Sequence, residues 1–259
     1  MIISLINNKG GVGKTTTAVN LAAGLIGKNR RILLIDLDSQ GSASLSLGIA
    51  RHDLPPSSAN VLLNRVPIQT VIRKTTIKGL DLITGSMDLA NADLSLSDVN
   101  GREKQLKSAI ETIRNNYDFI IMDCPPSLSL LPINALVATD AYIIPVTPQY
   151  LALEGLANLM DVVEKIRQGI GTTAILLGIV LTLVDYRVRA TKEIIDMLRG
   201  HYGHQIFKTE IRINVRLSEA PSFGKTIFDY DKTSTGAESY RNLAIEVTQR
   251  CQRNKYGNK

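Results

Sequence analysis

The sequence predicts an α/β fold in which a doubly wound, mostly parallel sheet is flanked by helices. Along its 259 residues, short apolar runs rich in β-branched side chains alternate with helix-length amphipathic segments, an order typical of doubly wound sheets. The apolar runs are continuous rather than alternating in polarity, which indicates strands buried on both faces, as in a parallel sheet. Because neither an internal repeat nor a low-complexity linker interrupts this order, we expect residues 1–259 to form a single domain.

The expected elements follow one another regularly from the N-terminus. The apolar runs predict strands at 2–6 (IISLI), 31–36 (RILLID), 80–84 (LDLIT), 118–123 (DFIIMD), 141–146 (AYIIPV), 175–184 (ILLGIVLTLV) and 204–209 (HQIFKT). The amphipathic segments predict helices near 14–27, 101–116, 152–168, 190–202 and 236–252. The stretch 39–79, which contains DLPPSS, lacks such a pattern and is expected to carry short helices and surface loops.

Composition and charge narrow the class of protein. The longest apolar stretch, 172–184, falls short of the roughly 18 residues of a membrane span, and no secretion signal is recognisable. Cys124 and Cys251 belong to no Cys-x-x-Cys pair, which argues against a disulfide framework or a cysteine-type zinc site and favours a cytosolic setting. The formal net charge is +6, and residues 180–259 carry 14 Lys and Arg against 9 Asp and Glu. This excess weakly favours a polyanionic partner.

The motif that carries the chemistry is NNKGGVGKTT (7–16), between the first expected strand and the first expected helix. It matches the phosphate-binding pattern G-x-x-x-x-G-K-[ST] except that Asn8 replaces the first glycine, and Lys9 stands five residues before Lys14. A glycine-rich turn that binds nothing would not account for the whole string in a strand–loop–helix context. The motif therefore predicts a nucleotide site, and it raises the question of why one loop would need two lysines.

The residues of this loop have expected tasks. Glycines allow a tight turn and let backbone N–H groups approach phosphate oxygens, and the following helix adds the positive end of its dipole. Lys14 would reach the β- and γ-phosphates, and the Thr15 hydroxyl would bind Mg²⁺. The loop residues expected to bind nucleotide in this way are Gly10, Gly11, Val12, Gly13, Lys14, Thr15 and Thr16.

Carboxylates follow two of the expected strands. In YDFIIMDCPPS a hydrophobic strand ends in Asp123, the usual form of the Walker B carboxylate that helps to hold Mg²⁺. In RILLIDLDSQ, Asp36 and Asp38 stand at another strand's carboxyl end, the edge where ligands collect in such sheets. One of the pair could orient the attacking water, whereas Asp36 is expected to cap the next segment. Because the guanine-reading motif Asn-Lys-x-Asp does not occur in the chain, the base is expected to be adenine.

These motifs carry a family resemblance. KGGVGKTT is similar to the deviant Walker A motif of the ParA/MinD ATPases. LLIDLDSQGSAS resembles the second motif of that family, and YDFIIMDCPPSLSLLPINAL resembles its Walker B and switch region. IIPVTPQYLALEGL and INVRLSEAPSFGKTIFDYD extend the match almost to the C-terminus. Among the branches of the family, the chain most resembles the small Soj-type ParA proteins.

The resemblance implies a task for the second lysine. Lys9 corresponds to the signature lysine, which in this family contacts the phosphates bound by the other subunit of a nucleotide-sandwiched homodimer, while Lys14 serves its own subunit. A cation donated in trans makes dimer stability depend on bound triphosphate, much as an arginine finger does. By the same resemblance Asp38 takes part in hydrolysis together with the two lysines, and the metal ligands are Thr15, Asp38 and Asp123.

The resemblance also implies a DNA surface and an adenine contact. Arg187, Arg189 and Arg216 fall where Soj-like proteins carry arginines that bind the DNA backbone without sequence preference, an interaction that salt weakens. Arg212 lies in the segment beside the adenine in relatives, although this chain reads IRIN where IPRN is usual, so Arg212 stands in place of a proline. The chain also reads DSQGS (38–42) where DPQGN is usual.

The expected function is that of an ATPase that positions a cargo. ATP and Mg²⁺ are the expected cofactors. The ATP-bound homodimer would bind nucleoid DNA in the cytoplasm, and a ParB-like or other cargo adaptor would stimulate its weak hydrolysis. The cargo could be a plasmid, a chromosome or a protein assembly.

Two other functions remain open at this point. A MinD-like membrane switch needs an amphipathic C-terminal helix, but the chain ends in TQRCQRNKYGNK, which is too polar, so no stable membrane association is expected. A metabolic enzyme on the same scaffold could be an ATP-dependent ligase or an iron–sulfur reductase. The positions of Cys124 and Cys251 do not match the reductase's ligand set.

Overall fold

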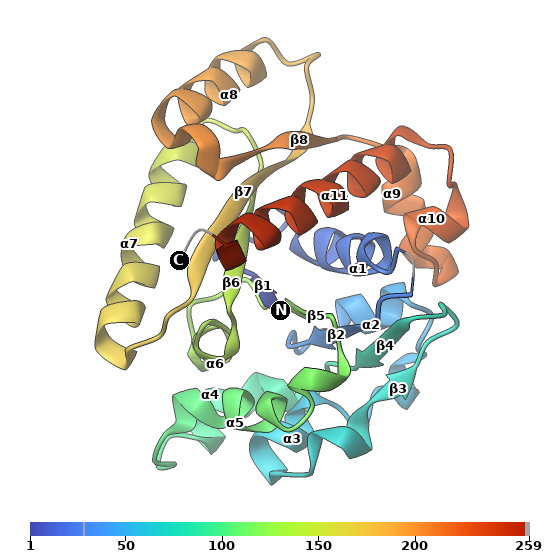
Figure 1. Ribbon diagram of the computed structural model, residues 1–259, viewed down its shortest axis with the longest axis vertical. Helices are drawn as coiled ribbons and strands as arrows, with labels where there is room; N and C mark the ends of the chain where they lie inside the picture. Colours follow the sequence, from blue (N-terminus) through green and yellow to red (C-terminus); the bar gives the residue numbers. More distant parts are fainter. Residues whose placement is uncertain (28, 257–259) are drawn as a thin grey trace.

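The computed structural model describes residues 1–27 and 29–256, the side chains of 254–256 excepted. The described residues form an eight-stranded sheet in the order β3-β4-β2-β5-β1-β6-β7-β8 (Figure 1). The strands are β1 (Ile2–Leu5), β2 (Ile32–Asp36), β3 (Arg73–Lys74), β4 (Leu80–Ile83), β5 (Phe119–Asp123), β6 (Ala141–Val146), β7 (Ile175–Val184) and β8 (Ile206–Arg212). Every described pairing is parallel except that of β3 with β4. The predicted α/β class with a doubly wound, mostly parallel sheet is confirmed.

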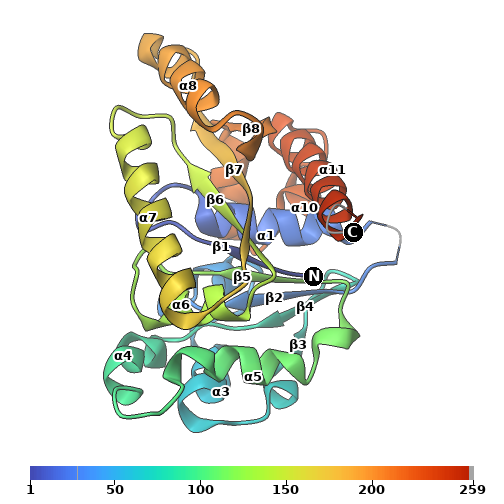
Figure 2. The ribbon, with the colours of Figure 1, turned by 60° about the vertical axis from the view of Figure 1, so that its left-hand side comes forward.

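Helices cover both faces of this sheet (Figure 2). The α-helices are α1 (Lys14–Leu25), α2 (Ser42–Ser46), α3 (Ser58–Asn64), α4 (Ala92–Ser95), α5 (Gln105–Glu111), α6 (Leu130–Ala138), α7 (Ala152–Ile170), α8 (Arg189–Tyr202), α9 (Val215–Glu219), α10 (Ile227–Tyr230) and α11 (Thr235–Tyr256). Short 3₁₀ turns lie at η1 (Arg51–Asp53), η2 (Ile68–Val71), η3 (Met87–Asn91), η4 (Arg102–Lys104), η5 (Arg114–Asn116), η6 (Gly203–Gln205) and η7 (Ala220–Phe223).

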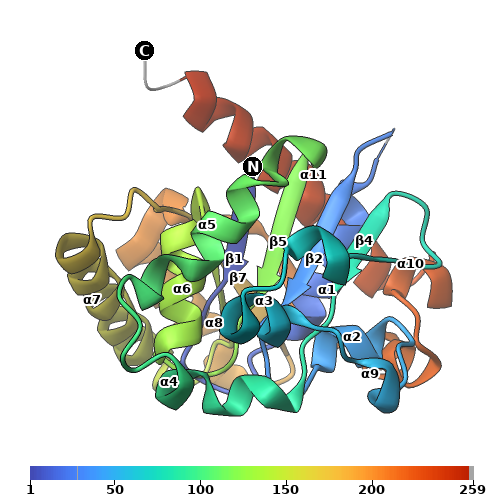
Figure 3. The same ribbon diagram turned by 90° about the horizontal axis from the view of Figure 1, so that it is seen from below.

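Two hydrophobic cores lie on opposite faces of the sheet. Successive strand residues alternate between them: Leu33 belongs to the core shared with α3, α5, α6, α7 and α8, and Leu34 to the core shared with α1, α9, α10 and α11. Figure 3 shows α1 and α11 together on one side of the sheet and α6 and α7 on the other. Because both faces are covered, all residues of the central strands β1, β2 and β5 are buried, which explains their continuous apolar pattern.

The structure departs from the expected elements at identifiable places. The helix expected at 101–116 is interrupted, because α5 is flanked by the 3₁₀ turns η4 and η5. Helix α6 was not expected: its sequence LLPINALVA is apolar on all sides and carries Pro132, which a helix tolerates in its first turn. Strand β8 begins and ends later than the expected 204–209. The stretch 39–79 holds short helices, as predicted. None of the described helices combines the length and the apolar character needed to cross a membrane.

Candidate functional site

The glycine loop joins β1 to α1 at the carboxyl end of a central strand. Gly11 and Gly13 adopt φ angles of 72° and 73°, in the left-handed region that favours glycine. A Cβ atom on Gly10 or Gly11 would meet nothing within 4 Å, so the inner side of the loop is open. Within the described residues, the N–H groups of residues 10–13 donate to no protein atom, and α1 starts without a side-chain cap. Free N–H groups at a helix N-terminus form an anion site.

Lys14 places its ammonium group at the mouth of this loop. Its Nζ donates to the carbonyl oxygen of Lys9 at 2.7 Å, and the residue is only 6% exposed. Burial lowers the pKa of Lys14, while the carboxylate of Asp123 opposes that shift. A buried cation surrounded by free N–H groups completes a site suited to phosphate.

Asp123 ends β5 as a buried carboxylate that lacks partners. Neither of its oxygens makes a hydrogen bond of normal geometry, and the residue is 0% exposed. Burial raises the pKa of Asp123, and so does Asp36, its register partner on β2; the hydroxyl of Thr15 acts in the opposite direction. An unpaired buried carboxylate is unfavourable unless a cation compensates it, so Asp123 and Thr15 suit a magnesium site.

The donor set fits magnesium held mainly through a nucleotide. Among the described residues, no group of three or more His, Cys, Asp or Glu side chains could hold a metal ion. Mg²⁺ usually keeps several waters and binds through one or two carboxylates together with substrate phosphates. One buried carboxylate, one hydroxyl and a phosphate loop therefore form a suitable set.

Asp36 has a structural role, as its sequence context predicted. Its Oδ2 accepts hydrogen bonds from the N–H and the hydroxyl of Ser44 in α2, at 2.9 and 2.7 Å, and its Oδ1 accepts the N–H of Asp38 at 3.1 Å. Burial raises the pKa of Asp36 to about 6. A Cβ on Gly85 would lie 2.4 Å from the carbonyl oxygen of Asp38, so a glycine is required there. Asp36 thus fixes the loop that carries Asp38.

Asp38 lies half-buried on that loop, beyond the end of β2. Its Oδ1 accepts the N–H of Gln40 at 2.9 Å. The negative charge of Asp38 raises the pKa of both Lys14 and Asp123. That charge therefore lies near the mouth of the loop. Its roles in hydrolysis and in metal binding stay predictions.

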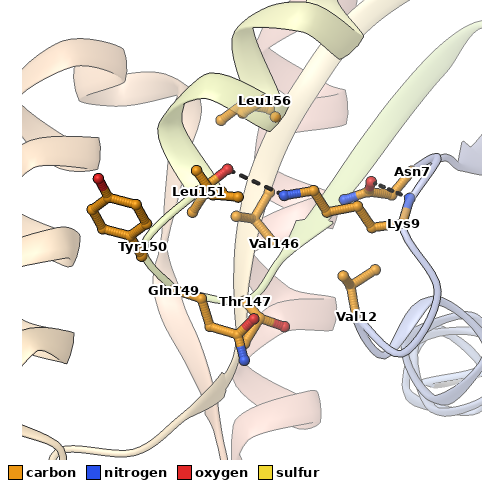
Figure 4. Close-up of a pocket in the computed structure, with 11 residues that line it drawn as sticks. Asn7, Lys9, Val12, Val146, Thr147, Gln149, Tyr150, Leu151 and Leu156 are labelled. Carbon is orange, nitrogen blue, oxygen red and sulfur yellow. Dashed lines mark hydrogen bonds between the residues drawn. The ribbon is translucent and has the colours of Figure 1, made fainter.

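Lys9 extends across a pocket of about 290 Å³ between the loop and the start of α7 (Figure 4). Its Nζ donates to the carbonyl oxygen of Leu151 at 3.1 Å. A Cβ on Gly155 would lie 2.7 Å from that Nζ, so the lysine fits because position 155 has no side chain. The N–H of Lys9 donates to Asn7 Oδ1 at 2.9 Å, and Asn7 donates to the carbonyl oxygen of Pro145 at 2.7 Å. The ammonium group of Lys14 therefore contacts the phosphate loop, whereas that of Lys9 contacts the segment just before α7.

Two residues that support the loop were missed by sequence reasoning. Asn7 anchors its start to β6, as described above. Thr182 on β7 donates its hydroxyl to the carbonyl oxygen of Val12 at 2.8 Å and is buried. The one available signal was the presence of a polar residue near the end of an apolar strand, which is weak. Both residues matter because they hold the backbone of the loop rather than its ligand.

Comparison with known proteins identifies the family. A family model described as an AAA domain matches residues 1–176. The sporulation initiation inhibitor protein Soj of Bacillus subtilis is 44% identical over 246 residues, which cover 95% of this chain and 97% of that protein. The chain belongs to the Soj-type branch of the ParA/MinD ATPase family. The chromosome partitioning protein ParA of Myxococcus xanthus is likewise 43% identical over 249 residues, covering 96% of this Soj-type chain and 88% of the relative.

A solved structure is similar over nearly the whole Soj-type chain. Cobyrinic acid a,c-diamide synthase from Mycobacterium smegmatis with bound ADP and magnesium is 31% identical, with a TM-score of 0.84, and the match covers 98% of this chain and 96% of that one. The similarity confirms the fold. That related protein therefore holds ADP and magnesium.

The remaining predicted residues of this Soj-type chain lie where β7 and β8 end. Arg212 is exposed, and its guanidinium lies 5.1 Å from the ring centre of Tyr186. Arg187 forms an ion pair with Asp185, while Arg189 begins α8. Arg216 in α9 pairs with its own neighbours, described below. The structure thus places these arginines near the ends of two adjacent strands, and their roles stay predictions.

Proposed function

We propose that this protein hydrolyses ATP and that its ATP-bound form is a homodimer that binds DNA without sequence preference to position a cargo. The observation that carries the proposal is the divergence of its two loop lysines. Lys14 remains inside its own phosphate loop, whereas Lys9 leaves that loop and lies exposed over the start of α7. A cation beside a nucleotide site but outside it is available to a second subunit.

ATP and Mg²⁺ are the cofactors that this site fits. The free N–H groups of the loop and the ammonium of Lys14 would bind the phosphates, and Thr15 and Asp123 would hold the hydrated cation. When bound, the cation neutralises charge on the phosphates. Asp38, on the loop that Asp36 fixes, would orient the attacking water and complete the metal site.

Lys9 would provide the link between nucleotide and dimer. Its hydrogen bond to Leu151 is exposed and made to a neutral carbonyl, so water can replace that acceptor at a cost of about 1 kcal/mol. The phosphates of the partner subunit would attract the same ammonium more strongly, because both groups are charged. Dimer stability would then follow the presence of triphosphate, and hydrolysis would release the partner.

Two further roles complete the proposal. Arg187, Arg189 and Arg216 would bind DNA phosphates, so the dimer would be associated with the nucleoid in the cytoplasm. A ParB-like or other adaptor would stimulate hydrolysis and couple it to the cargo. The name of the Myxococcus xanthus relative, a chromosome partitioning protein, supports partitioning of a chromosome as the general task. Arg212 would lie beside the adenine, stacked on Tyr186.

Retention on random duplex DNA tests this proposal. The protein is applied at one salt concentration with ATP, with ADP and without nucleotide, and we expect retention with ATP alone. Equal retention in all three states would contradict the proposal. In parallel, light scattering reports the molecular mass, which we expect to double with ATP. The Asp38→Ala variant should remain dimeric on ATP, and normal turnover in that variant would show that Asp38 is misassigned.

The solved synthase favours a second candidate, an ATP-dependent ligase. Its match covers 98% of this chain at 31% identity, whereas the relatives named for sporulation control and partitioning are 44% and 43% identical. Phosphate release is therefore also measured with pooled carboxylate and amine acceptors in the absence of DNA. An acceptor-dependent increase would favour the ligase, and turnover that responds only to DNA and adaptor would favour the ATPase.

A further inference from the structure

Two of the proposed DNA-binding arginines follow the adjacent strands β7 and β8. Val184 and Arg212 are register partners, and the N–H of Ile213 donates to the carbonyl oxygen of Val184 at 3.1 Å. Arg187 follows β7, and Arg216 follows β8. A depression of about 500 Å³ between them is lined by Val184, Asp185, Tyr186, Arg187, Arg212, Ile213 and Val215. Arg187 lines this depression, whereas Arg216 lies in α9, one residue beyond the lining residue Val215.

Arg187 is engaged by a carboxylate of its own chain. Its Nε donates to Asp185 Oδ1 at 2.8 Å and its Nη2 to Oδ2 at 2.7 Å, and the backbone N–H of Arg187 donates to Oδ1 at 3.0 Å. This is the two-pronged geometry by which arginine also binds a phosphate. These hydrogen bonds lower the pKa of Asp185, so the carboxylate stays charged. The Arg187 side chain is 82% exposed and that of Asp185 is 20% exposed, so Arg187 itself covers no buried part of the fold.

Arg216 is also engaged by carboxylates of its own chain, with a different geometry. Its Nη1 donates to Glu219 Oε2 at 2.9 Å, and its Nε lies 3.7 Å from Asp231 Oδ2. The same oxygen of Glu219 accepts the hydroxyl of Tyr230 at 3.0 Å, and the ring of Tyr230 stacks on Phe223 with centroids 5.1 Å apart. Because an aromatic hydroxyl holds it in place, Glu219 is positioned for Arg216 before any ligand arrives.

We infer that Asp185 and Glu219 set the affinity for DNA by competing with its phosphates for Arg187 and Arg216. The inference rests on the proposed binding of DNA and adds its regulation. Each carboxylate occupies N–H donors of its arginine and offsets the positive charge that would attract a phosphate, so one subunit binds DNA weakly. A dimer brings two sets of arginines to one duplex, and the second contact then forms within the complex. Competition of this kind makes DNA binding depend on the dimer.

The expected size of the effect follows from the exposure of the pairs. Exposed ion pairs change an equilibrium by about 1.5- to 5-fold each. Loss of the Asp185 charge in both subunits should therefore tighten DNA binding of the ATP-bound dimer by about 2- to 25-fold. If Asp185 instead oriented Arg187 toward DNA, removal of its charge would weaken DNA binding.

The test measures the Kd of the Mg–ATP-bound full chain for a fluorescent random 24-base-pair duplex at several salt concentrations. Asp185→Asn keeps an oxygen that can accept the N–H of Arg187, so the local turn is preserved. Asp98→Asn is the matched control, because it makes the same substitution at an exposed residue outside β7, β8 and α8 that forms no ion pair with the described residues. Arg187→Ala, alone and combined with Asp185→Asn, completes a double-mutant cycle. Glu219→Gln repeats the test at Arg216.

We expect tighter binding for Asp185→Asn and Glu219→Gln, less than a twofold change for Asp98→Asn, and no effect of Asp185→Asn once Arg187 is alanine. Unchanged or weaker binding of Asp185→Asn would overturn the inference, and so would equal tightening by the control, since net charge alone would then explain the result. If the unaltered dimer binds no DNA at all, the proposed function fails instead. If it binds DNA and Arg187→Ala has no effect, only the inference fails.

Discussion

The contact between Lys9 and Gly155 offers the most direct test of the trans lysine. In Gly155→Ala, the new Cβ would lie 2.7 Å from Lys9 Nζ and 2.8 Å from its Cε, distances at which one side must move. The atoms in the way belong to the end of a flexible side chain, so the lysine is displaced rather than the helix. The hydrogen bond from Lys9 to Leu151 is then lost, while the phosphate loop is untouched.

The expected change in the dimer dissociation constant follows from the loss of that single hydrogen bond. Its net contribution is about 1 kcal/mol, so its loss frees Lys9 roughly fivefold more often in each subunit. Both lysines act in the dimer, and we therefore expect Gly155→Ala to lower the dimer dissociation constant by about 25-fold with a slowly hydrolysed ATP analogue. Without nucleotide, no change in mass is expected.

Sedimentation equilibrium over a range of concentrations measures this constant. Gly169→Ala is the matched control: it lies on the same helix α7 and gains the same helix propensity, but its Cβ meets nothing within 4 Å. The reasoning is refuted if the two variants dimerise equally well, or if Gly155→Ala dimerises less well than the unaltered protein. Combining Gly155→Ala with Lys9→Ala should abolish the gain.

Three further predictions concern the nucleotide site and its support. The raised pKa of Asp36, about 6, means that the folded state binds a proton more tightly than the unfolded state, so this group's stabilisation is lost as the pH rises from about 4 through 6. Relative to the unaltered protein, Asp36→Asn should therefore gain about 3 kcal/mol over that window in urea titrations, whatever constant cost the lost hydrogen bonds to Ser44 impose; a pH-independent difference would contradict this. Asp123→Asn should bind Mg–ATP at least about tenfold more weakly by calorimetry, because a ligand of the metal site is lost; unchanged magnesium dependence would exclude Asp123 from the metal site. Tyr240→Phe removes the 3.2 Å contact with the Thr17 hydroxyl and should cost about 0.5–1.5 kcal/mol of unfolding free energy by urea titration, and no loss would show that the two hydroxyls do not bond.

Much of the fold and part of the site could be predicted from the sequence. Continuous apolar strands and the glycine loop have local signatures, and the capping role of Asp36 followed from its place at a strand end. The position of the Lys9 ammonium group could not be predicted, because its hydrogen-bond acceptor is a backbone carbonyl and the space that it occupies exists only because Gly155 has no side chain. Helix α6 had no amphipathic period to find, since both its sides are buried.

The ion pairs of the arginines could be predicted only in part. Arg216 and Glu219 are three residues apart on one helix, a spacing at which side chains meet. The sequence alone did not show that Asp231 approaches the same arginine from another segment, because that contact depends on how α9 and α10 fold back against each other. Local pairs are visible in a sequence, whereas pairs across segments need the structure.

The support of the glycine loop comes partly from the far end of the chain. Tyr240 of α11 is fully buried against α1, the N–H of Ile227 donates to Asn20 Oδ1 at 2.8 Å, and a Cβ on Gly24 would lie 3.1 Å from that of Ala244. During synthesis, α1 can therefore pack fully only after almost the entire polypeptide has left the ribosome, because its packing partners lie near the C-terminus. A nascent chain stalled before this segment would carry the complete loop sequence and still lack a stable place to hold a nucleotide.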